Sequence, residues 1–246
     1  MKVTFHDLIS STMRRIILFC LPYAGGNKYS YRQFESKAPS FLELRTLEYP
    51  GRGGRIHEPL MFDINALVDD LYREMESRLS GNEYAIYGHS MGGLIACLLS
   101  RKIVTNDRNP PLHLFITGTS GPSSPLRKNR KRHLLDRAAF FDEVKKLNGS
   151  PDHILENEEM LDFIEPILRA DFCATETYIY ESADPLRIRF TVITGTEEDL
   201  LMEDIKLWQR ETTCKVDFEQ LKGGHFFIYD EVEAILRTIS NKILNR

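Results

Sequence analysis

The segment Gly88-His89-Ser90-Met91-Gly92 places a serine at the centre of a G-x-S-x-G pattern. Such a serine lies on a sharp turn between a strand and a helix, where its hydroxyl can act as a nucleophile. The apolar residues before and after the pattern predict that strand and that helix. Glycines at positions 88 and 92 leave room for the tight backbone. We therefore interpret Ser90 as a candidate nucleophile and His89 as a structural residue, and the alternative is a glycine-rich turn without chemistry.

A serine becomes a useful nucleophile only when a base takes its proton. The chain has seven histidines, and in folds with this serine turn the acid and then the histidine follow the serine. His225, in the stretch Lys222-Gly223-Gly224-His225-Phe226, comes after the last predicted strand and is the histidine in that place. We predict His225 as the base, and the alternative is a loop histidine without a catalytic role.

Three carboxylates follow the predicted strand at 189–194, in the stretch Gly195-Thr196-Glu197-Glu198-Asp199. A catalytic acid is needed to orient the imidazole and to stabilise its cation. We predict Asp199 as this acid and keep Glu198 as the second choice, because the spacing does not separate them. Glu197 is expected to lie on the surface.

Acyl transfer to a serine also requires two hydrogen-bond donors for the oxyanion. One donor is usually the N–H of the residue after the serine, which here is Met91. The other comes from the loop after an earlier strand, and Pro22-Tyr23-Ala24-Gly25-Gly26 follows the apolar run 16–21. We predict the N–H groups of Ala24 and Met91 as the donors. The alternative for the loop is a turn that only reverses the chain.

Strands and helices alternate along the chain, which predicts an α/β fold with a mostly parallel central sheet flanked by helices. The expected strands are residues 15–21, 42–49, 83–87, 112–117, 189–194 and 215–218. The expected flanking helices are residues 65–79, 94–103 and 230–244. We expect residues 1–246 to form a single domain.

Residues about 122–185 interrupt this alternation, and they are too many for an ordinary connection. They predict helices at 138–147, 157–170 and 172–180, so we expect a helical lid insertion over the carboxyl edge of the sheet. Its apolar residues are expected to cover an acyl channel, and most of them to form the core of the lid: Phe140, Phe141, Leu147, Leu161, Phe163, Ile164 and Phe172.

The composition excludes several classes of protein. A net charge of −4 gives no basic field for nucleic acid. Residues 1–15 lack the apolar core of a secretory signal, and no apolar run approaches the roughly 20 residues that cross a bilayer. Cys20, Cys97, Cys173 and Cys214 form no C-x-x-C pair, which favours buried free thiols over disulfides or a zinc site. We expect a cytoplasmic protein without a metal, a cofactor or a membrane association.

Five segments, "LFCLPYAGG", "LEYPGRGGR", "YGHSMGG", "LRADF" with "ETYIY", and "GGHFFI", occur in this order over roughly residues 15–240. This ordered set resembles the type II (editing) thioesterases of nonribosomal peptide and polyketide synthases, relatives of the medium-chain fatty-acyl thioesterases. The resemblance implies an α/β-hydrolase fold, a helical lid, a Ser90–Asp199–His225 triad and the oxyanion donors Ala24 and Met91. The acid loop departs mildly from the family pattern because it reads Glu-Glu-Asp-Leu.

The resemblance also implies a reaction, the hydrolysis of aberrant or stalled acyl groups from the phosphopantetheine arm of a carrier protein. The expected partner is therefore an acyl- or peptidyl-carrier protein, and we expect a monomer. The alternatives are a medium-chain fatty-acyl-carrier thioesterase and a general carboxylesterase. A cyclising thioesterase built into a synthase is disfavoured, because no carrier domain accompanies the sequence.

Arg127-Lys128-Asn129-Arg130-Lys131-Arg132 is basic at five of its six positions, in a chain that is acidic overall. We hypothesise that it attracts an acidic carrier protein or the phosphate of its pantetheine arm. The alternative is a solvated charged loop. The glycine-rich stretch 51–55 lacks the sequence of a nucleotide-binding loop.

Overall fold

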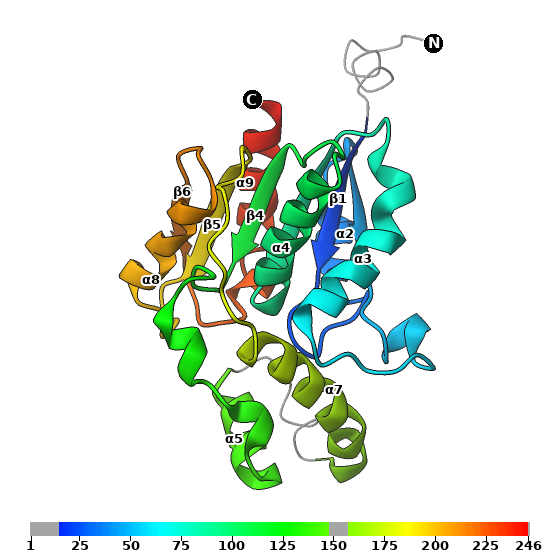
Figure 1. Cartoon of the computed structure of the whole chain (residues 1–246), viewed down its shortest axis with the longest axis vertical. Coiled ribbons are helices and arrows are strands. Elements are labelled where there is room, and N and C mark those ends of the chain that lie inside the picture. Colours follow the sequence, from blue (N-terminus) through cyan, green and yellow to red (C-terminus); the bar gives the residue numbers. More distant parts are fainter. Residues whose placement is uncertain (1–14, 148–156, 246) are drawn as a thin grey trace.

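The structure is a computed structural model that describes residues 15–147 and 157–245. Its centre is a sheet with the strand order β2-β1-β3-β4-β5-β6, in which every pairing is parallel (Figure 1). The strands are β1 (Ile16–Leu21), β2 (Leu42–Thr46), β3 (Tyr84–His89), β4 (His113–Thr117), β5 (Arg189–Gly195) and β6 (Asp217–Leu221). The predicted parallel sheet is confirmed, and the strand ends differ from the predicted ones by a few residues.

Helices connect these strands, and a further helix follows the last one. They are α2 (Arg32–Lys37), α3 (Ile64–Leu79), α4 (Met91–Thr105), α5 (Arg137–Lys146), α7 (Glu158–Glu176), α8 (Met202–Lys206) and α9 (Val232–Leu244). The sequence reasoning missed the short helices α2 and α8. It also divided α7 into two helices, which is wrong, because α7 buries Leu161, Leu168 and Phe172 along one continuous face. Its Pro166 does not end the helix.

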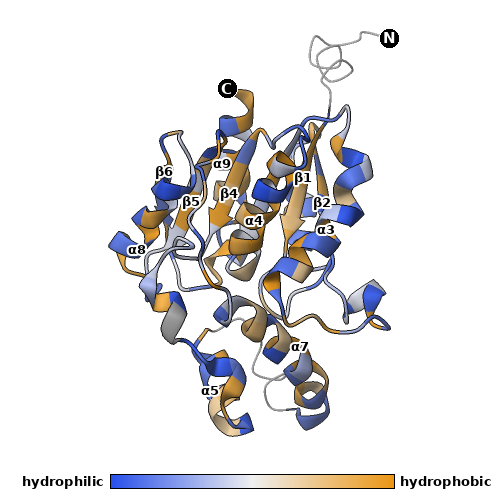
Figure 2. Cartoon of the chain, viewed as in Figure 1, coloured by the Kyte–Doolittle hydropathy of each residue, from blue (hydrophilic) through white to orange (hydrophobic). Residues whose placement is uncertain are grey.

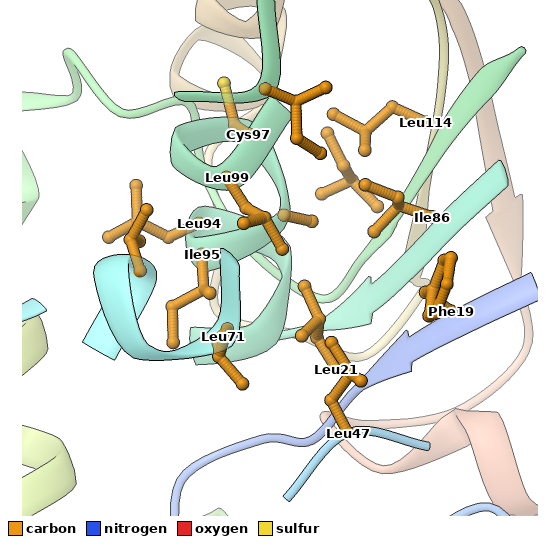
Figure 3. Close-up of a cluster of buried hydrophobic side chains, with 14 of the residues drawn as sticks. Phe19, Leu21, Leu47, Leu71, Ile86, Leu94, Ile95, Cys97, Leu99 and Leu114 are labelled. Carbon is orange, nitrogen blue, oxygen red and sulfur yellow. The ribbon is translucent and has the colours of Figure 1, made fainter. Parts of the chain in front are cut away.

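The strand β1 is buried on both faces because helices cover both sides of the sheet. Its residues Ile17, Phe19 and Leu21 belong to a core shared with α3 and α4. Figure 3 shows Phe19 and Leu21 in this core. The alternating residues Ile16 and Leu18 point into a second core that includes residues of α2 and α9. Figure 2 shows that β1 and β4, inside the sheet, are mainly apolar.

The residues between β4 and β5 that carry α5 and α7 are called the helical insertion here. Both helices lie beyond the ends to which the strand arrows point (Figure 1), which is the carboxyl edge of the parallel sheet. The insertion has its own apolar cluster, formed by Phe140, Phe141, Val144, Leu161, Leu168 and Phe172. Of the apolar residues predicted for this part, Phe163 differs, because 57% of it is exposed.

The four cysteines are free in the structure. Cys20 and Cys97 are buried as expected, and burial raises the pKa of both thiols. Cys173 and Cys214 are half-buried, so the expected burial holds for two of the four. Within residues 15–147 and 157–245, no helix is long and apolar enough to span a membrane.

Candidate active site

Ser90 lies on the turn between β3 and α4, as predicted. Its backbone has φ 55° and ψ −115°, in the left-handed region that a non-glycine residue adopts only under strain. A Cβ at Gly88 would lie 2.1 Å from the Gly92 carbonyl oxygen, and a Cβ at Gly92 would lie 2.1 Å from the Leu21 carbonyl oxygen. The turn therefore requires glycine at both positions, because each faces backbone that cannot move aside.

His225 lies next to Ser90, although 135 positions separate them in the chain. The loop after β6 carries it, and its Nε2 is 3.1 Å from the Ser90 Oγ. The rings of Phe226 and His89 pack beside the imidazole, with ring centroids 5.2 and 4.9 Å from its own. These contacts hold the ring in an orientation in which Nε2 can accept the serine proton.

The carboxylate against His225 belongs to Glu198, so the prediction of Asp199 at this place is wrong. The Glu198 Oε1 is 2.6 Å from the His225 Nδ1, and the Glu198 side chain is only 2% exposed. Its Oε2 accepts a hydrogen bond of 2.7 Å from the Gly195 N–H at the end of β5. Asp199 is exposed at the next position. The turn after β5 directs Glu198, the third residue after Gly195, inward, and the spacing of the three carboxylates in the sequence does not indicate this.

His89 is fully buried behind His225. Its Nδ1 is 3.0 Å from the Thr117 Oγ1. Burial, and to a lesser degree the neighbouring His225, lower the pKa of His89 well below its ordinary value, so its ring stays neutral. A neutral ring in this place supports the His225 imidazole without adding a charge beside it.

Gly118 is a site residue that the sequence reasoning missed. It follows β4 with φ 63°, and a Cβ there would lie 2.4 Å from the His89 Cε1 and 3.2 Å from the Glu198 Oε1. A side chain at this position would therefore displace the two residues that contact His225. The signal in the sequence is a glycine directly after a predicted core strand.

The predicted oxyanion donors line the same cavity as Ser90 and His225. Met91 is the first residue of α4, so its N–H has no acceptor within the helix. The loop after β1 carries Ala24, whose neighbours Gly25 and Gly26 donate their N–H groups to the Asp171 Oδ2 and to the Tyr23 carbonyl oxygen. These two bonds hold the loop on the C-terminal side of Ala24.

A cavity of about 1460 Å³ opens between the carboxyl edge of the sheet and the helical insertion. It is larger than the roughly 300–1,000 Å³ of ordinary small-molecule pockets. Apolar side chains of the insertion line part of it: Val144, Ile164, Ile167, Leu168 and Phe172. Basic side chains also line it: Arg127, Arg130, Lys131 and Arg132. The cavity can therefore hold a flexible apolar chain together with a polar or anionic group.

The basic segment 127–132 is only partly the free charged loop that the alternative described. Arg127 donates hydrogen bonds of 2.7 Å to the Thr119 Oγ1 and to the Ser120 carbonyl oxygen. Arg132 donates to the Glu176 Oε1 over 2.7 Å. Arg130 and Lys131 are exposed. The hypothesis of charge attraction therefore concerns these two residues, and the side chains of 128 and 129 lie outside the described part.

The arrangement Ser90–His225–Glu198 can transfer a proton from the serine hydroxyl to an imidazole that a carboxylate orients. Such an arrangement forms and hydrolyses acyl-enzymes. In the part of the chain that the structure describes, no three His, Cys, Asp or Glu side chains are grouped so that they could hold a metal ion.

Comparisons with known proteins agree with this chemistry. A family model described as a thioesterase domain matches residues 16–243. The gramicidin S biosynthesis protein GrsT of Aneurinibacillus migulanus is 31% identical over 217 residues, which are 88% of this chain and 84% of that protein. The crystal structure of ClbQ from the colibactin NRPS/PKS pathway has a TM-score of 0.87 and 30% identity, over 94% of this chain and 98% of that one.

The type II thioesterase BorB from the borrelidin biosynthetic cluster has a TM-score of 0.84 and 28% identity, over 93% of this chain and 92% of that one. The medium-chain S-acyl fatty acid synthase thioesterase of Homo sapiens is 30% identical over 98% of this chain and 90% of that protein. The solved structure of human thioesterase 2 has a lower TM-score of 0.70. The chain has the α/β-hydrolase fold, as predicted, and its relatives favour type II thioesterases over the fatty-acid alternative.

Proposed function

Since this chain belongs to the thioesterase family and is a thioester hydrolase, we propose that Ser90, His225 and Glu198 form its catalytic triad. The single observation that carries this proposal is the continuous chain of short contacts from Ser90 through His225 to Glu198. A carboxylate in the place of Glu198 fixes the tautomer that leaves the Nε2 lone pair free. It also stabilises the imidazolium that forms when the serine proton moves.

The reaction proceeds in two halves. In the first, the His225 Nε2 takes the Ser90 proton while the Ser90 Oγ attacks the thioester carbonyl carbon. The C–S bond then breaks, and the imidazolium returns the proton to the leaving thiolate, which departs as a thiol. In the second half, His225 takes a proton from water, the hydroxide attacks the acyl-serine ester, and the free acid is released as Ser90 regains its proton.

The N–H groups of Ala24 and Met91 stabilise the oxyanion of both tetrahedral intermediates. Met91 contributes from the N-terminus of α4, where the helix dipole also favours negative charge. Donors that are already oriented need no reorganisation during the reaction, and each typically contributes about 10²–10³-fold to kcat. Their placement on one wall of the cavity with Ser90 supports this assignment.

The substrate that fits best is an acyl group on the phosphopantetheine arm of a carrier protein of nonribosomal peptide or polyketide biosynthesis. The similarity to ClbQ and BorB over nearly the whole chain supports this class. The large cavity offers apolar surface to the acyl group and the cations Arg130 and Lys131 to the phosphate or to an acidic carrier. The enzyme removes aberrant or stalled acyl groups as a monomer, in the cytoplasm.

The test is acyl release from a loaded carrier protein by the wild-type enzyme and by Ser90→Ala. Loss of at least roughly 10³-fold in rate is expected for the alanine variant, because the triad acts as a unit. A variant with the wild-type rate would refute the assignment of the nucleophile. Simple oxygen esters test the carboxylesterase alternative, since faster turnover of these esters than of the acyl-carrier would favour it.

A further inference from the structure

Arg52 and Asp171 form a buried ion pair that joins the body of the fold to the helical insertion. Two hydrogen bonds of 2.5 and 2.7 Å connect the guanidinium to the carboxylate. The side chains are 4% and 0% exposed, and 119 positions separate them in the chain. Burying two charges contributes little net stability, because the loss of hydration offsets their attraction. We therefore expect this pair to have a function other than stabilising the fold.

The same carboxylate holds the loop that carries Ala24. The Asp171 Oδ2 accepts a hydrogen bond of 2.7 Å from the Gly25 N–H. Leu168, one helical turn before Asp171 on α7, covers Gly25, since a Cβ at Gly25 would lie 2.6 Å from the Leu168 Cδ2. The Ala24 side chain packs between the apolar cluster of the insertion and the main core. Two contacts thus connect α7 to Gly25, and the insertion also touches Ala24.

The beginning of this loop is held differently. The Tyr31 hydroxyl donates a hydrogen bond of 2.8 Å to the Leu21 carbonyl oxygen. The Tyr49 hydroxyl donates one of 2.8 Å to the Pro22 carbonyl oxygen. Both tyrosines belong to the body of the fold. The body therefore fixes the start of the loop, whereas the two members of the ion pair hold its end, Asp171 through the Gly25 N–H and Arg52 through a hydrogen bond of 3.4 Å to the Gly26 carbonyl oxygen.

We propose that Arg52 and Asp171 are positioning residues that set the direction of the Ala24 N–H, so that catalysis requires α7 in its place against the oxyanion loop. The inference rests on the proposed role of Ala24 as an oxyanion donor. Asp171 holds the Gly25 N–H, whereas the Ala24 N–H belongs to the preceding peptide plane, between Tyr23 and Ala24. The Gly26 N–H donates to the Tyr23 carbonyl oxygen of that plane, so holding Gly25 restrains the plane through this turn, and Arg52 fixes the orientation of the Asp171 carboxylate. The helical insertion then completes the catalytic site as well as covering the substrate.

The decisive variant replaces both charges, Arg52→Met with Asp171→Leu. It leaves no unpaired buried charge, so it is expected to fold, but it removes the acceptor for the Gly25 N–H. We expect kcat for a small acyl N-acetylcysteamine thioester to fall roughly 10- to 100-fold. This loss is smaller than the loss expected when an oxyanion donor is removed altogether. KM should change less than about twofold. A folded double variant with the wild-type kcat overturns the proposal.

Two inhibitors separate positioning from general damage. A trifluoromethyl ketone that adds to Ser90 forms an oxyanion, so its affinity is expected to fall by the same factor as kcat/KM. A non-hydrolysable thioether analogue forms no oxyanion, and its affinity should remain within about twofold. Equal losses for both compounds overturn the proposal, because they indicate damage to the whole cavity.

A matched control is the ion pair between Arg101 and Glu211, whose side chains are 19% and 1% exposed and do not line the cavity. Arg101→Met with Glu211→Leu should leave kcat within about twofold of the wild type, since it leaves the loop contacts intact. A loss of kcat as large as in the Arg52/Asp171 variant overturns the proposal.

Amide hydrogen exchange of the wild-type protein tests the coupling without any substitution. The Gly25 N–H is expected to exchange together with the α7 amides around Asp171, because the Gly25 N–H loses its acceptor when this part of α7 leaves the loop or unfolds. Fast Gly25 exchange while α7 stays protected overturns the proposal. Failure of the proposed function is distinguishable, because Ser90→Ala would then retain activity whatever the exchange data show.

Discussion

Replacing Glu198 by glutamine tests the acid assignment most directly. Glu198 accepts two hydrogen bonds, one from the Gly195 N–H and one from the His225 Nδ1–H. Glutamine has a single amide oxygen and cannot accept both. If the oxygen stays with Gly195, the amide N–H₂ faces Nδ1 and moves the imidazole proton to Nε2. The His225 Nε2, which faces Ser90, then carries a proton and has no lone pair to accept the serine proton.

The size of the effect follows from this wrong tautomer. In a serine protease with the same hydrogen-bond arrangement, the amide replacement of the acid lowers kcat about 10⁴-fold, equivalent to about 5.4 kcal/mol of transition-state stabilisation. We expect a loss of roughly 10³–10⁴-fold for Glu198→Gln. Glu198→Asp keeps the charge but shortens the side chain by one methylene, and a displacement of this order costs roughly 10²-fold.

Asp199→Asn is the matched control, because Asp199 is exposed one position further along the same loop. Its kcat should stay within about threefold of the wild type, since a surface charge contributes little. The assay follows thiol release from an acyl N-acetylcysteamine thioester at saturating substrate. A large loss in Asp199→Asn together with a small loss in Glu198→Gln would refute the assignment of the acid.

Two further predictions concern charge. Arg130→Glu with Lys131→Glu should raise KM for an acyl-carrier substrate roughly tenfold at low ionic strength and leave KM for the small thioester unchanged, and equal effects on both substrates would contradict the hypothesis. Burial lowers the pKa of His113 to about 4, whereas an unfolded histidine has about 6.5. The unfolded state therefore binds more protons, and His113 makes the free energy of unfolding fall by about 3 kcal/mol as pH decreases from 6.5 to 4. In urea titrations of His113→Gln, the free energy of unfolding should therefore fall by about 3 kcal/mol less between pH 6.5 and pH 4 than in the wild type. An unchanged pH dependence would contradict the lowered pKa of His113.

The sequence predicts the parts of the site that local structure determines. The strand, turn and helix around Ser90 follow from the apolar runs and from Gly88 and Gly92, since those features act within a few residues. His225 was identified by its place after the last predicted strand, because the acid and then the histidine follow the serine in folds with this serine turn. The choice between Glu198 and Asp199 failed because it depends on which side chain the turn after β5 directs inward.

The contacts of the helical insertion were beyond the reach of the sequence. Arg52 appears in a glycine-rich stretch and Asp171 within a predicted helix, and neither position indicates the other. Their pairing depends on how α7 packs over the carboxyl edge of the sheet, which periodicity does not encode. The apolar pattern of the insertion did predict that it is helical and most of its core, because burial along one face leaves a local signal, although α7 was divided into two helices.

The strand order has a consequence for the synthesis of the protein. Ser90 follows β3 near the middle of the sheet, whereas His225 follows the edge strand β6 and Glu198 follows β5. A growing chain that has left the ribosome only as far as β4 carries the serine turn but neither the base nor the acid. With the triad that we propose, hydrolytic activity is acquired late in translation, when the last strand joins the sheet, and a chain that ends before it cannot release acyl groups.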